Sequence, residues 1–454
     1  MSSAGAGLFL IVSLLALLAL GVPVAFALGL TALFAILLFL SPAELNFFGE
    51  FVFESLNNFT LLAIPLFIFM GAIFGGSKAS VDLFEAGHLW LSRIRGGLAM
   101  SSVVACSLFA ALCGSSAATA AAIGRVAIPE MSKRGYSPRI SSGTIVAGGT
   151  LGILIPPSVT LILYGIATEQ SIGQLFIAGI VPGFVLTVMF CGWVFVAARR
   201  EAGRPDPQSQ HSPGPGAAVA QRVRDAERIY WRDRFAALLK VLPFLSLIVG
   251  VLAVLYLGLA TPSEAAAVGA LLAFLMVIVV YRSMTWRRIS AILLESTRES
   301  TMVMMIVAFS AVLGTVMSFL AIPQDLALLI TDLQLNRWVV MIAINLVLLA
   351  LGLFLPPVSV ILMVAPVFFP VIVELGFDPI WFGIIMSVNL EMGLITPPVG
   401  LNLYVVKGIA PEVPLRDILA GSLPYVAIIA LAIVLFSVFP EIVTWLPDAL
   451  FGGG

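Results

Sequence analysis

Two apolar stretches of this chain each carry a glycine followed by a double proline. They read Gly152-Ile-Leu-Ile-Pro156-Pro157-Ser158 and Gly393-Leu-Ile-Thr396-Pro397-Pro398-Val399-Gly400. Proline has no amide hydrogen, so the carbonyls of Gly152 and Gly393 lose the donors that a helix would give them. Unsatisfied carbonyls in hydrocarbon are costly, and a dehydrated cation is a natural partner for a cluster of them. The two segments therefore predict two cation sites; a kink satisfied by neighbouring helices and water is the alternative.

Hydroxyl and amide side chains accompany these segments. Ser158, Thr396 and Asn402 lie beside the double prolines. Small and hydroxylated residues, which let the backbone open at membrane depth, form the run Cys113-Gly114-Ser115-Ser116-Ala117-Ala118-Thr119. The corresponding run in the second half is Leu355-Pro356-Pro357-Val358-Ser359. Both runs predict hairpin turns that meet the broken helix of their own half; for the first run, close helix packing through small residues is the alternative.

Two charged residues deserve separate treatment. Glu391 precedes the second double proline, and an acid inside a membrane is a candidate for function. Its structural alternative is a carboxylate hydrogen-bonded to Asn389 or to helix termini. Arg125 lies about nine residues beyond the first hairpin turn, or about two and a half helical turns. There it could pair with a substrate carboxylate, and an anchor at the membrane interface is the alternative.

The segments that carry these residues recur along the chain. An offset of 241 residues superimposes the two double prolines and also aligns Pro129 with Pro370, Gly135 with Gly376, and Pro138 with Pro379. Paired, proline-interrupted hydrophobic segments in the two halves of a membrane protein point to the binding site of a transporter. The repeat therefore makes transport the first function to consider.

The composition is that of a membrane protein. Of 454 residues, 61% are hydrophobic and 10% are charged, and apolar runs recur along nearly the whole length. Cys106, Cys113 and Cys191 lie in apolar segments without disulfide or metal-ligand spacing, and His88 and His211 are far apart. Because no paired acids or His–Asp cluster is evident, an intramembrane enzyme is disfavoured. We expect no cofactor, no metal other than a coupling cation, and no nucleic acid.

The basic residues indicate the topology. With the N-terminus outside, we place crossings near 7–20, 22–40, 59–76, 140–166 and 175–198, and again near 236–259, 263–281, 299–321, 380–405 and 418–440. Residues 97–123 and 338–372 are predicted to form re-entrant hairpins. This arrangement puts 22 of the 23 basic residues on the cytoplasmic side and leaves Arg337 outside. If either segment instead spanned the membrane once, every later loop would change sides and this bias would break; the alternative is that both are ordinary helix pairs that cross fully.

The predicted fold is an all-α polytopic membrane protein with an inverted repeat, two re-entrant hairpins and two helices broken at Pro-Pro. The first repeat covers 1–198 and the inverted second repeat covers 235–454, with both termini outside. Residues 199–234 form a cytoplasmic linker that ends in an amphipathic helix around Arg222–Arg234. Two further segments suit helices along the membrane surfaces, 44–58 and 78–95.

Several motifs of the chain carry a family resemblance. They are Gly21-Val-Pro-Val-Ala-Phe26, Ile64-Pro-Leu-Phe-Ile-Phe-Met-Gly71, Gly114-Ser-Ser-Ala-Ala-Thr-Ala-Ala-Ala-Ile-Gly124, Ile128-Pro-Glu-Met131, Gly152 to Ser158, Thr261-Pro-Ser-Glu-Ala-Ala-Ala267 and Asn389-Leu-Glu-Met-Gly-Leu-Ile-Thr-Pro-Pro-Val-Gly-Leu-Asn402. Together they resemble the large, DctM-like membrane subunit of tripartite ATP-independent periplasmic (TRAP) transporters. The resemblance covers essentially the whole chain outside the linker.

This resemblance implies a sodium-driven secondary transporter that imports a small organic acid by an elevator motion against a scaffold. The residues it assigns to one sodium site are Ser115, Ser116, Gly152, Ile155 and Pro157, with the last three acting through their carbonyls. Those it assigns to the other site, at the second hairpin, are Ser359, Gly393, Thr396 and Val399. The candidate substrate ligands are Arg125, Thr119, Ser158 and Asn402. A structural or coupling role falls to Asn389 and Glu391.

The resemblance also implies partners and a location. A small four-helix, DctQ-like membrane subunit would be a separate chain, and a DctP-like periplasmic protein would deliver the substrate. Their setting is the cytoplasmic membrane of a bacterium or archaeon. The family often carries an acid near the second hairpin turn, where this chain has Leu355-Pro356-Pro357. A stand-alone sodium–anion symporter without a binding protein is the alternative; a channel suits two inverted halves less well.

Overall fold

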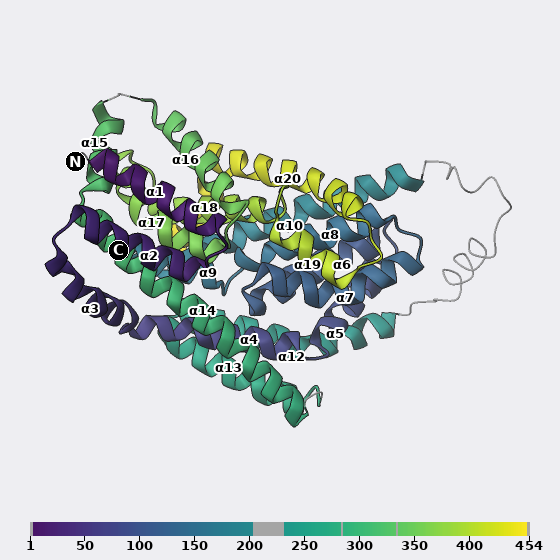
Figure 1. Cartoon of the computed structure of the whole chain (residues 1–454). Helices are drawn as coiled ribbons and strands as arrows, with labels where there is room; N and C mark the ends of the chain where they lie inside the picture. The colour runs from purple at the N-terminus through teal and green to yellow at the C-terminus, as the bar shows by residue number, and fades with distance from the viewer. Residues whose placement is uncertain (1–2, 203–230, 283–284, 333–334, 452–454) are drawn as a thin grey trace.

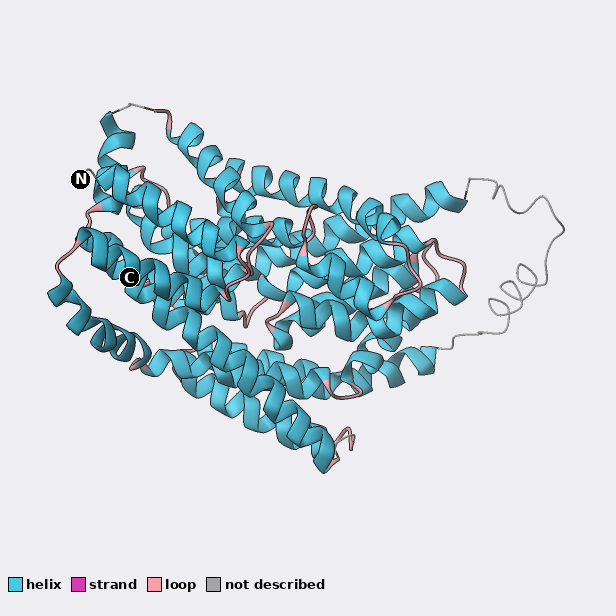
Figure 2. Ribbon diagram, viewed as in Figure 1, coloured by secondary structure: helices cyan, strands magenta, loops and turns pink. Residues whose placement is uncertain are grey.

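The computed structural model describes residues 3–202, 231–282, 285–332 and 335–451. Within these ranges all regular secondary structure is helical (Figure 2). The helices form an elongated bundle in which the two ends of the chain lie toward the same end (Figure 1). The all-α class predicted from the sequence is confirmed.

The first half of the chain contains the two arms of the first hairpin and the first broken helix. Its α-helices are α1 (Ser3–Ala19), α2 (Val24–Phe39), α3 (Leu45–Leu56), α4 (Ala63–Gly75), α5 (Ala79–Leu91), α6 (Gly97–Cys113), α7 (Ser116–Lys133), α8 (Pro138–Thr150), α9 (Val159–Thr168) and α10 (Ile172–Ala202). Its 3-10 helices are η1 (Pro42–Glu44), η2 (Phe59–Leu62) and η3 (Leu151–Ile153).

The second half contains the two arms of the second hairpin and the second broken helix. Its helices are α12 (Trp231–Tyr256), α13 (Pro262–Val279), α14 (Trp286–Phe319), α15 (Ile322–Asp332), α16 (Arg337–Gly352), α17 (Pro357–Glu374), α18 (Pro379–Leu394), α19 (Leu401–Ile409), α20 (Leu415–Val438) and α21 (Glu441–Phe451). Helix α17 begins and ends 241 residues after α7. The offset read from the prolines therefore also relates the helices, while inversion across the membrane stays a prediction.

Matching local signals start the two broken helices. The Ser137 side chain accepts the backbone amide three residues later at the start of α8, and Asp378 does the same at the start of α18. Each of these helices has proline in its first turn, where a missing amide costs nothing. The caps lie 241 residues apart, so the repeat extends to the residues that position the broken helices.

The two predicted hairpins are present as helix pairs joined by short turns, α6–α7 and α16–α17. The predicted boundary at 123 is wrong, because α7 continues to Lys133. The helix ends just before Gly135, whose φ of +79° is the left-handed conformation that terminates helices. Gly376, with φ of +70°, follows α17 in the same way. The depth of either hairpin in a membrane stays a prediction.

Six described helices are long and apolar enough to cross a membrane: α10, α12, α13, α14, α17 and α20. Helix α3 with η2 and α4 makes a further candidate that bends by 60°. The predicted crossings at 140–166 and 380–405 are each two helices, α8–α9 and α18–α19, separated at the double proline. Helix α17 is also an arm of the second hairpin, so length and composition alone do not distinguish that arm from a span.

The broken helices lie in the core of the bundle. Every residue from Ile380 to Leu394 in α18 and from Ser141 to Thr150 in α8 is buried. Helix α8 packs on α6, α7 and α20, and α18 packs on α16 and α20. Helices α4, α12, α13 and α14 pack together along one side of the bundle (Figure 1). Within this layer, α4 contacts α6, α7 and α9, and α14 contacts α17, so the layer packs directly against the site segments.

The linker is shorter than predicted, because helices extend into it at both of its ends. Helix α10 continues to Ala202 and α12 begins at Trp231, so residues 199–202 and 231–234 are helical rather than linker. The amphipathic helix expected around Arg222–Arg234 lies mostly outside the described residues. The surface segments 44–58 and 78–95 contain α3 and α5, as helices were predicted there.

Candidate functional site

The turn of the first hairpin lies directly against the first broken helix. Helix α6 ends at Gly114, which has φ of +58°, and the Ser115 side chain caps α7 by accepting the Ala118 amide (3.5 Å). A Cβ atom on Gly152 would lie 2.7 Å from the Ser115 carbonyl oxygen and 2.9 Å from the Ser116 nitrogen. The structure thus brings together Ser115, Ser116 and Gly152, three residues predicted for the first sodium site.

Other polar groups of the first break form hydrogen bonds with one another. The Ser158 and Thr160 hydroxyls both donate to the Ile153 carbonyl, at 2.5 and 3.1 Å. Ser158 is fully buried and also caps α9, so the hydroxyl of this predicted substrate ligand is used locally in this structure. Ile155 is half-buried and Pro157 is buried, and both lie in the break as predicted.

The second break meets its hairpin differently. A Cβ atom on Gly393 would lie 2.6 Å from the Gly352 carbonyl carbon, at the end of the first arm rather than beyond the turn. The Gly393 carbonyl, which has no i+4 donor because residue 397 is proline, accepts the Thr396 amide instead (3.2 Å) as the helix tightens in its last turn. The Thr396 hydroxyl donates to the Met392 carbonyl (2.5 Å). Both double prolines contain a cis peptide bond.

Glu391 joins the two halves of the chain. Its side chain, on α18 of the second half, accepts the Ser116 hydroxyl of the first hairpin turn, at 2.9 Å to Oε2 and 3.2 Å to Oε1. Glu391 is 2% exposed. Of the two partners in the structural alternative, Asn389 makes no hydrogen bond with Glu391 among the described contacts, whereas a helix terminus does: Ser116 is the first residue of α7, 275 residues away in the sequence. A carboxylate therefore lies at the same turn as the first predicted sodium site.

Asn389 connects α18 to the second hairpin. Its amide donates to Asn345 on α16, at 2.7 Å to Oδ1 and 3.0 Å to the backbone carbonyl. Asn345 in turn donates to the Met341 carbonyl (2.9 Å). Since Asn389 and Glu391 are two residues apart, one short stretch of α18 contacts both hairpins.

Four buried oxygen atoms near these segments have no hydrogen-bond partner within the described part of the chain. They are Thr119 Oγ1, Ser359 Oγ, Asn389 Oδ1 and Asn402 Oδ1. The Asn402 amide nitrogen donates to the Val146 carbonyl (3.4 Å), which places α19 of the second half against α8 of the first. Buried oxygens without donors are costly unless a ligand satisfies them. Their chemistry fits a hard cation, which binds through oxygen.

The remaining predicted residues have contrasting surroundings. Thr119 is fully buried in the first turn of α7. Arg125, further along α7, is exposed and has no ion pair among the described residues. The preceding residue, Gly124, packs against Ile409 of α19. Helix α7 thus packs on α19 beside Arg125, whose own side chain is exposed. Val399 is half-buried in the second break.

One protein family matches almost the whole chain. The sequence model described as "Tripartite ATP-independent periplasmic transporter, DctM component" matches residues 11–442. The chain belongs to this family. The C4-dicarboxylate TRAP transporter large permease protein DctM of Pseudomonas aeruginosa is 39% identical over 93% of the chain and 94% of that relative. The sialic acid TRAP transporter large permease protein SiaM of Vibrio cholerae is 30% identical over 97% of the chain and 98% of that relative.

The fold of this DctM component also matches a solved transporter. The crystal structure of the Alcanivorax borkumensis YdaH transporter has a TM-score of 0.61, with 16% identity over 88% of the chain and 90% of that structure. The family match confirms the resemblance to the TRAP large subunit, and the likeness to this structure confirms the polytopic helical membrane fold. The relatives are transport proteins, in agreement with the expectation that the chain is not an enzyme.

Sequence reasoning missed several residues that tie the DctM fold together around the site. Asn345 is the one amide in the apolar helix α16, and that isolation was its available signal. The Tyr164 hydroxyl donates to the Pro379 carbonyl (2.7 Å), and Thr144 and Tyr425 share a hydrogen bond (3.1 Å). The Tyr164–Pro379 and Thr144–Tyr425 hydrogen bonds join the two halves at sequence separations of more than 200 residues. Neither motif spacing nor the repeat offset predicts contacts of this kind.

Proposed function

We propose that the chain is the large permease of a TRAP transporter that uses a sodium gradient to import a small organic acid. The observation that carries the proposal is the close contact of Gly152 with the turn at Ser115 and Ser116. It gathers hydroxyl and backbone oxygens at a buried break, and unwound carbonyls coordinate coupling cations in transporters of this architecture. Ile155 and Pro157 would complete this first sodium site.

The second sodium site would use Ser359, Gly393, Thr396 and Val399. Its support is the buried Ser359 hydroxyl without a donor and the Gly393–Gly352 contact. The Thr396 oxygen keeps lone pairs for a cation while its hydrogen serves the Met392 carbonyl. Glu391, bonded to Ser116, would supply a negative charge close to the first site and so couple the halves.

The substrate would be a carboxylate held by Arg125, with Thr119, Ser158 and Asn402 as further ligands; Ser158 would have to release the Ile153 carbonyl before it could donate to the substrate. Relatives named for C4-dicarboxylates and for sialic acid support an organic acid. An exposed guanidinium without an acidic partner is suited to a carboxylate that enters from solution. The side chain lies on a hairpin arm next to α19, so a bound acid would contact elements that carry both cation sites.

The transporter would have two partners and a defined orientation. A family described as tripartite supports a separate DctQ-like four-helix subunit and a DctP-like periplasmic binding protein. The setting would be the cytoplasmic membrane, with both termini outside and 199–234 inside. Substrate uptake by proteoliposomes without the binding protein would instead favour the stand-alone symporter.

The deciding experiment measures the melting temperature of the chain, purified with its small subunit, across a sodium series with choline at constant ionic strength. A ligand that binds the folded state raises its melting temperature by mass action, so we expect a saturable rise specific to sodium. Wild-type protein without a sodium-specific rise would point to proton coupling or to purely structural double prolines.

Thr396→Val sharpens this test at the second site. Removing one oxygen ligand should weaken the apparent sodium affinity about tenfold. The matched control is Thr315→Val on α14, because the Thr315 hydroxyl makes the same bond to a carbonyl four residues earlier (3.0 Å). Equal sodium dependence in both variants would remove Thr396 from the site.

A further inference from the structure

A groove opens at one end of the bundle, away from the hairpin turns. It lies between the C-terminal end of α10 and the N-terminal end of α20, over the first turn of α8, and encloses about 510 Å³. Small residues leave the space: Ala197 on one wall and Ala420 and Gly421 on the other. A Cβ atom on Gly421 would lie 2.2 Å from the Arg139 carbonyl oxygen, so α20 rests directly on α8.

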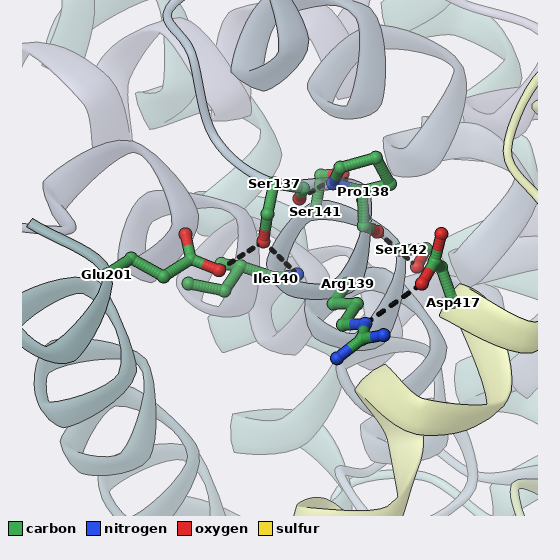
Figure 3. Close-up of polar contacts among 8 residues, drawn as sticks. All are labelled: Ser137, Pro138, Arg139, Ile140, Ser141, Ser142, Glu201 and Asp417. Carbon is green, nitrogen blue, oxygen red and sulfur yellow. Dashed lines mark hydrogen bonds and ion pairs between the residues drawn. The ribbon is translucent and has the colours of Figure 1, made fainter. Parts of the chain in front are cut away.

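One salt bridge and one hydrogen bond to a carboxylate connect the walls of this groove. Arg139 on α8 pairs with Asp417 on α20 (2.9 Å), and the Ser137 hydroxyl donates to Glu201 on α10 (Figure 3). Asp417 is paired with a base, whereas Glu201, which accepts only a hydroxyl hydrogen, keeps its negative charge beside Arg199 and Arg200 and offsets part of theirs. The charge of Arg139 is largely offset by Asp417, so the groove's free charge comes from elsewhere.

That free charge belongs to Arg199 and Arg200. Both are exposed, and neither has an acidic partner among the residues that the structure describes. Arg199 stacks on Phe195 at 4.7 Å and Arg200 on Trp193 at 5.9 Å. A guanidinium that stacks through its face keeps its N–H donors at the edge, where they can bind a phosphate oxygen.

The surroundings are amphipathic in the manner of a membrane interface. Trp193, which is partly exposed, lines the groove, and indole rings favour the level of lipid headgroups. Further along α10 from the arginines, Phe184, Val188 and Val196 are exposed at intervals of four or eight residues. A molecule with an anionic head and apolar tails would match this succession of charge, aromatic rings and apolar surface.

We propose that this groove binds an anionic phospholipid of the cytoplasmic leaflet, with its phosphate on Arg199 and Arg200 and its acyl chains along α10. Basic pockets between helices on the cytoplasmic side suit anionic headgroups. The assignment to that leaflet uses the predicted topology, which places the end of α10 inside. It is independent of the sodium and substrate sites.

The test is native mass spectrometry of the chain with its small subunit, titrated with phosphatidylglycerol or phosphatidylcholine of equal acyl chains. We expect preferential retention of phosphatidylglycerol. Replacing both arginines, as Arg199→Gln with Arg200→Gln, should weaken that retention about tenfold or more. The control, Arg287→Gln with Arg288→Gln, removes an equally exposed adjacent pair from the start of α14 and should retain the lipid.

A second variant tests whether lipid binding needs the space of the groove as well as its charge. Ala197→Trp fills the space but keeps both arginines, and should also lose the lipid.

Equal retention of the two lipids by the wild type would overturn the proposal, as would equal loss in both arginine pairs. Displacement by millimolar inorganic phosphate would show a site for free anions and would overturn the lipid assignment. Because Arg199 and Arg200 are exposed, their variants should melt as the wild type does, which keeps the test valid if Ala197→Trp fails to fold.

Discussion

At the scale of single residues, Glu391 is the buried acid of the candidate site, and the loss of its hydration must be compensated. A buried carboxylate is tolerated where hydrogen bonds or an opposite charge compensate its lost hydration. The Ser116 hydroxyl supplies one hydrogen bond, and a cation at the neighbouring break would supply the charge. Glu391 should therefore matter to sodium binding through its contact with the first hairpin turn.

A double-mutant cycle of Ser116→Ala and Glu391→Gln tests this contact through the sodium affinity. Each single variant should weaken binding, and the double variant should be little worse than Glu391→Gln, with a coupling of about 1.5–3 kcal/mol. Ser296→Ala on α14 serves as the control partner, since its hydroxyl bonds within its own helix (2.9 Å). Additive effects of Ser116→Ala and Glu391→Gln would contradict the link.

Arg125 is expected to act on the substrate and not on sodium. Arg125→Ala should lower uptake about 10- to 100-fold, because a charge-assisted bond to a carboxylate is lost. The sodium-dependent rise in melting temperature should persist. Arg93→Ala removes another exposed arginine and should transport normally. Undiminished uptake by Arg125→Ala would leave Arg125 as an interfacial anchor.

At the scale of elements, glycine permits the hairpins to approach the broken helices. Gly152 and Gly393 hold matching places in the repeat, yet one faces the turn of its hairpin and the other faces the end of an arm. The neighbouring atoms are backbone in both cases, so a side chain could not be accommodated by a rotamer change. The breaks and hairpins should therefore behave as one packed unit in each half.

Gly393→Ala probes this packing. Its new methyl group would lie 2.6 Å from backbone, and overpacking of this kind typically costs about 1–3 kcal/mol. We expect a lower melting temperature and weaker sodium dependence. Gly408→Ala in α19 is the control, because nothing lies within 4 Å of its added Cβ atom and alanine favours a helix. A Gly393→Ala protein as stable as the control would show that the hairpin yields freely.

At the scale of the whole molecule, contacts across the repeat decide how the halves fit. Tyr164 reaches the Pro379 carbonyl, Thr144 meets Tyr425, and Asn402 reaches Val146. All three join a broken helix to the opposite half. The two breaks are thus neighbours in one core, as an alternating-access site requires.

The topology can be tested by labelling with a membrane-impermeant maleimide in a variant without native cysteines. Arg288→Cys, at the start of α14, should react only from the cytoplasmic side, and Asp448→Cys, on α21, only from outside. Both positions are exposed, so a reagent on the correct side can reach them. Reaction of both from one side would refute the odd number of crossings between them, and with it the re-entrant second hairpin.

The sequence by itself determined the local features of this protein. Prolines and glycines act through their own backbone, so the breaks at Pro156-Pro157 and Pro397-Pro398, the turn at Gly114-Ser115 and the helix class followed from residue types and hydropathy. The 241-residue offset then related the halves. End points such as Lys133 were missed because a helix continues until a left-handed residue allows it to stop.

The tertiary structure alone decided which polar groups meet. Glu391 bonds to Ser116 rather than to Asn389, and Asn389 bonds to Asn345, since the folded core brings α18 between the two hairpins. A hydrogen bond depends on the separation of two atoms to within an ångström, and chain spacing does not fix that separation across hundreds of residues. The residues assigned to the site therefore stay predictions from the sequence, while the pairing of their polar groups is set by packing.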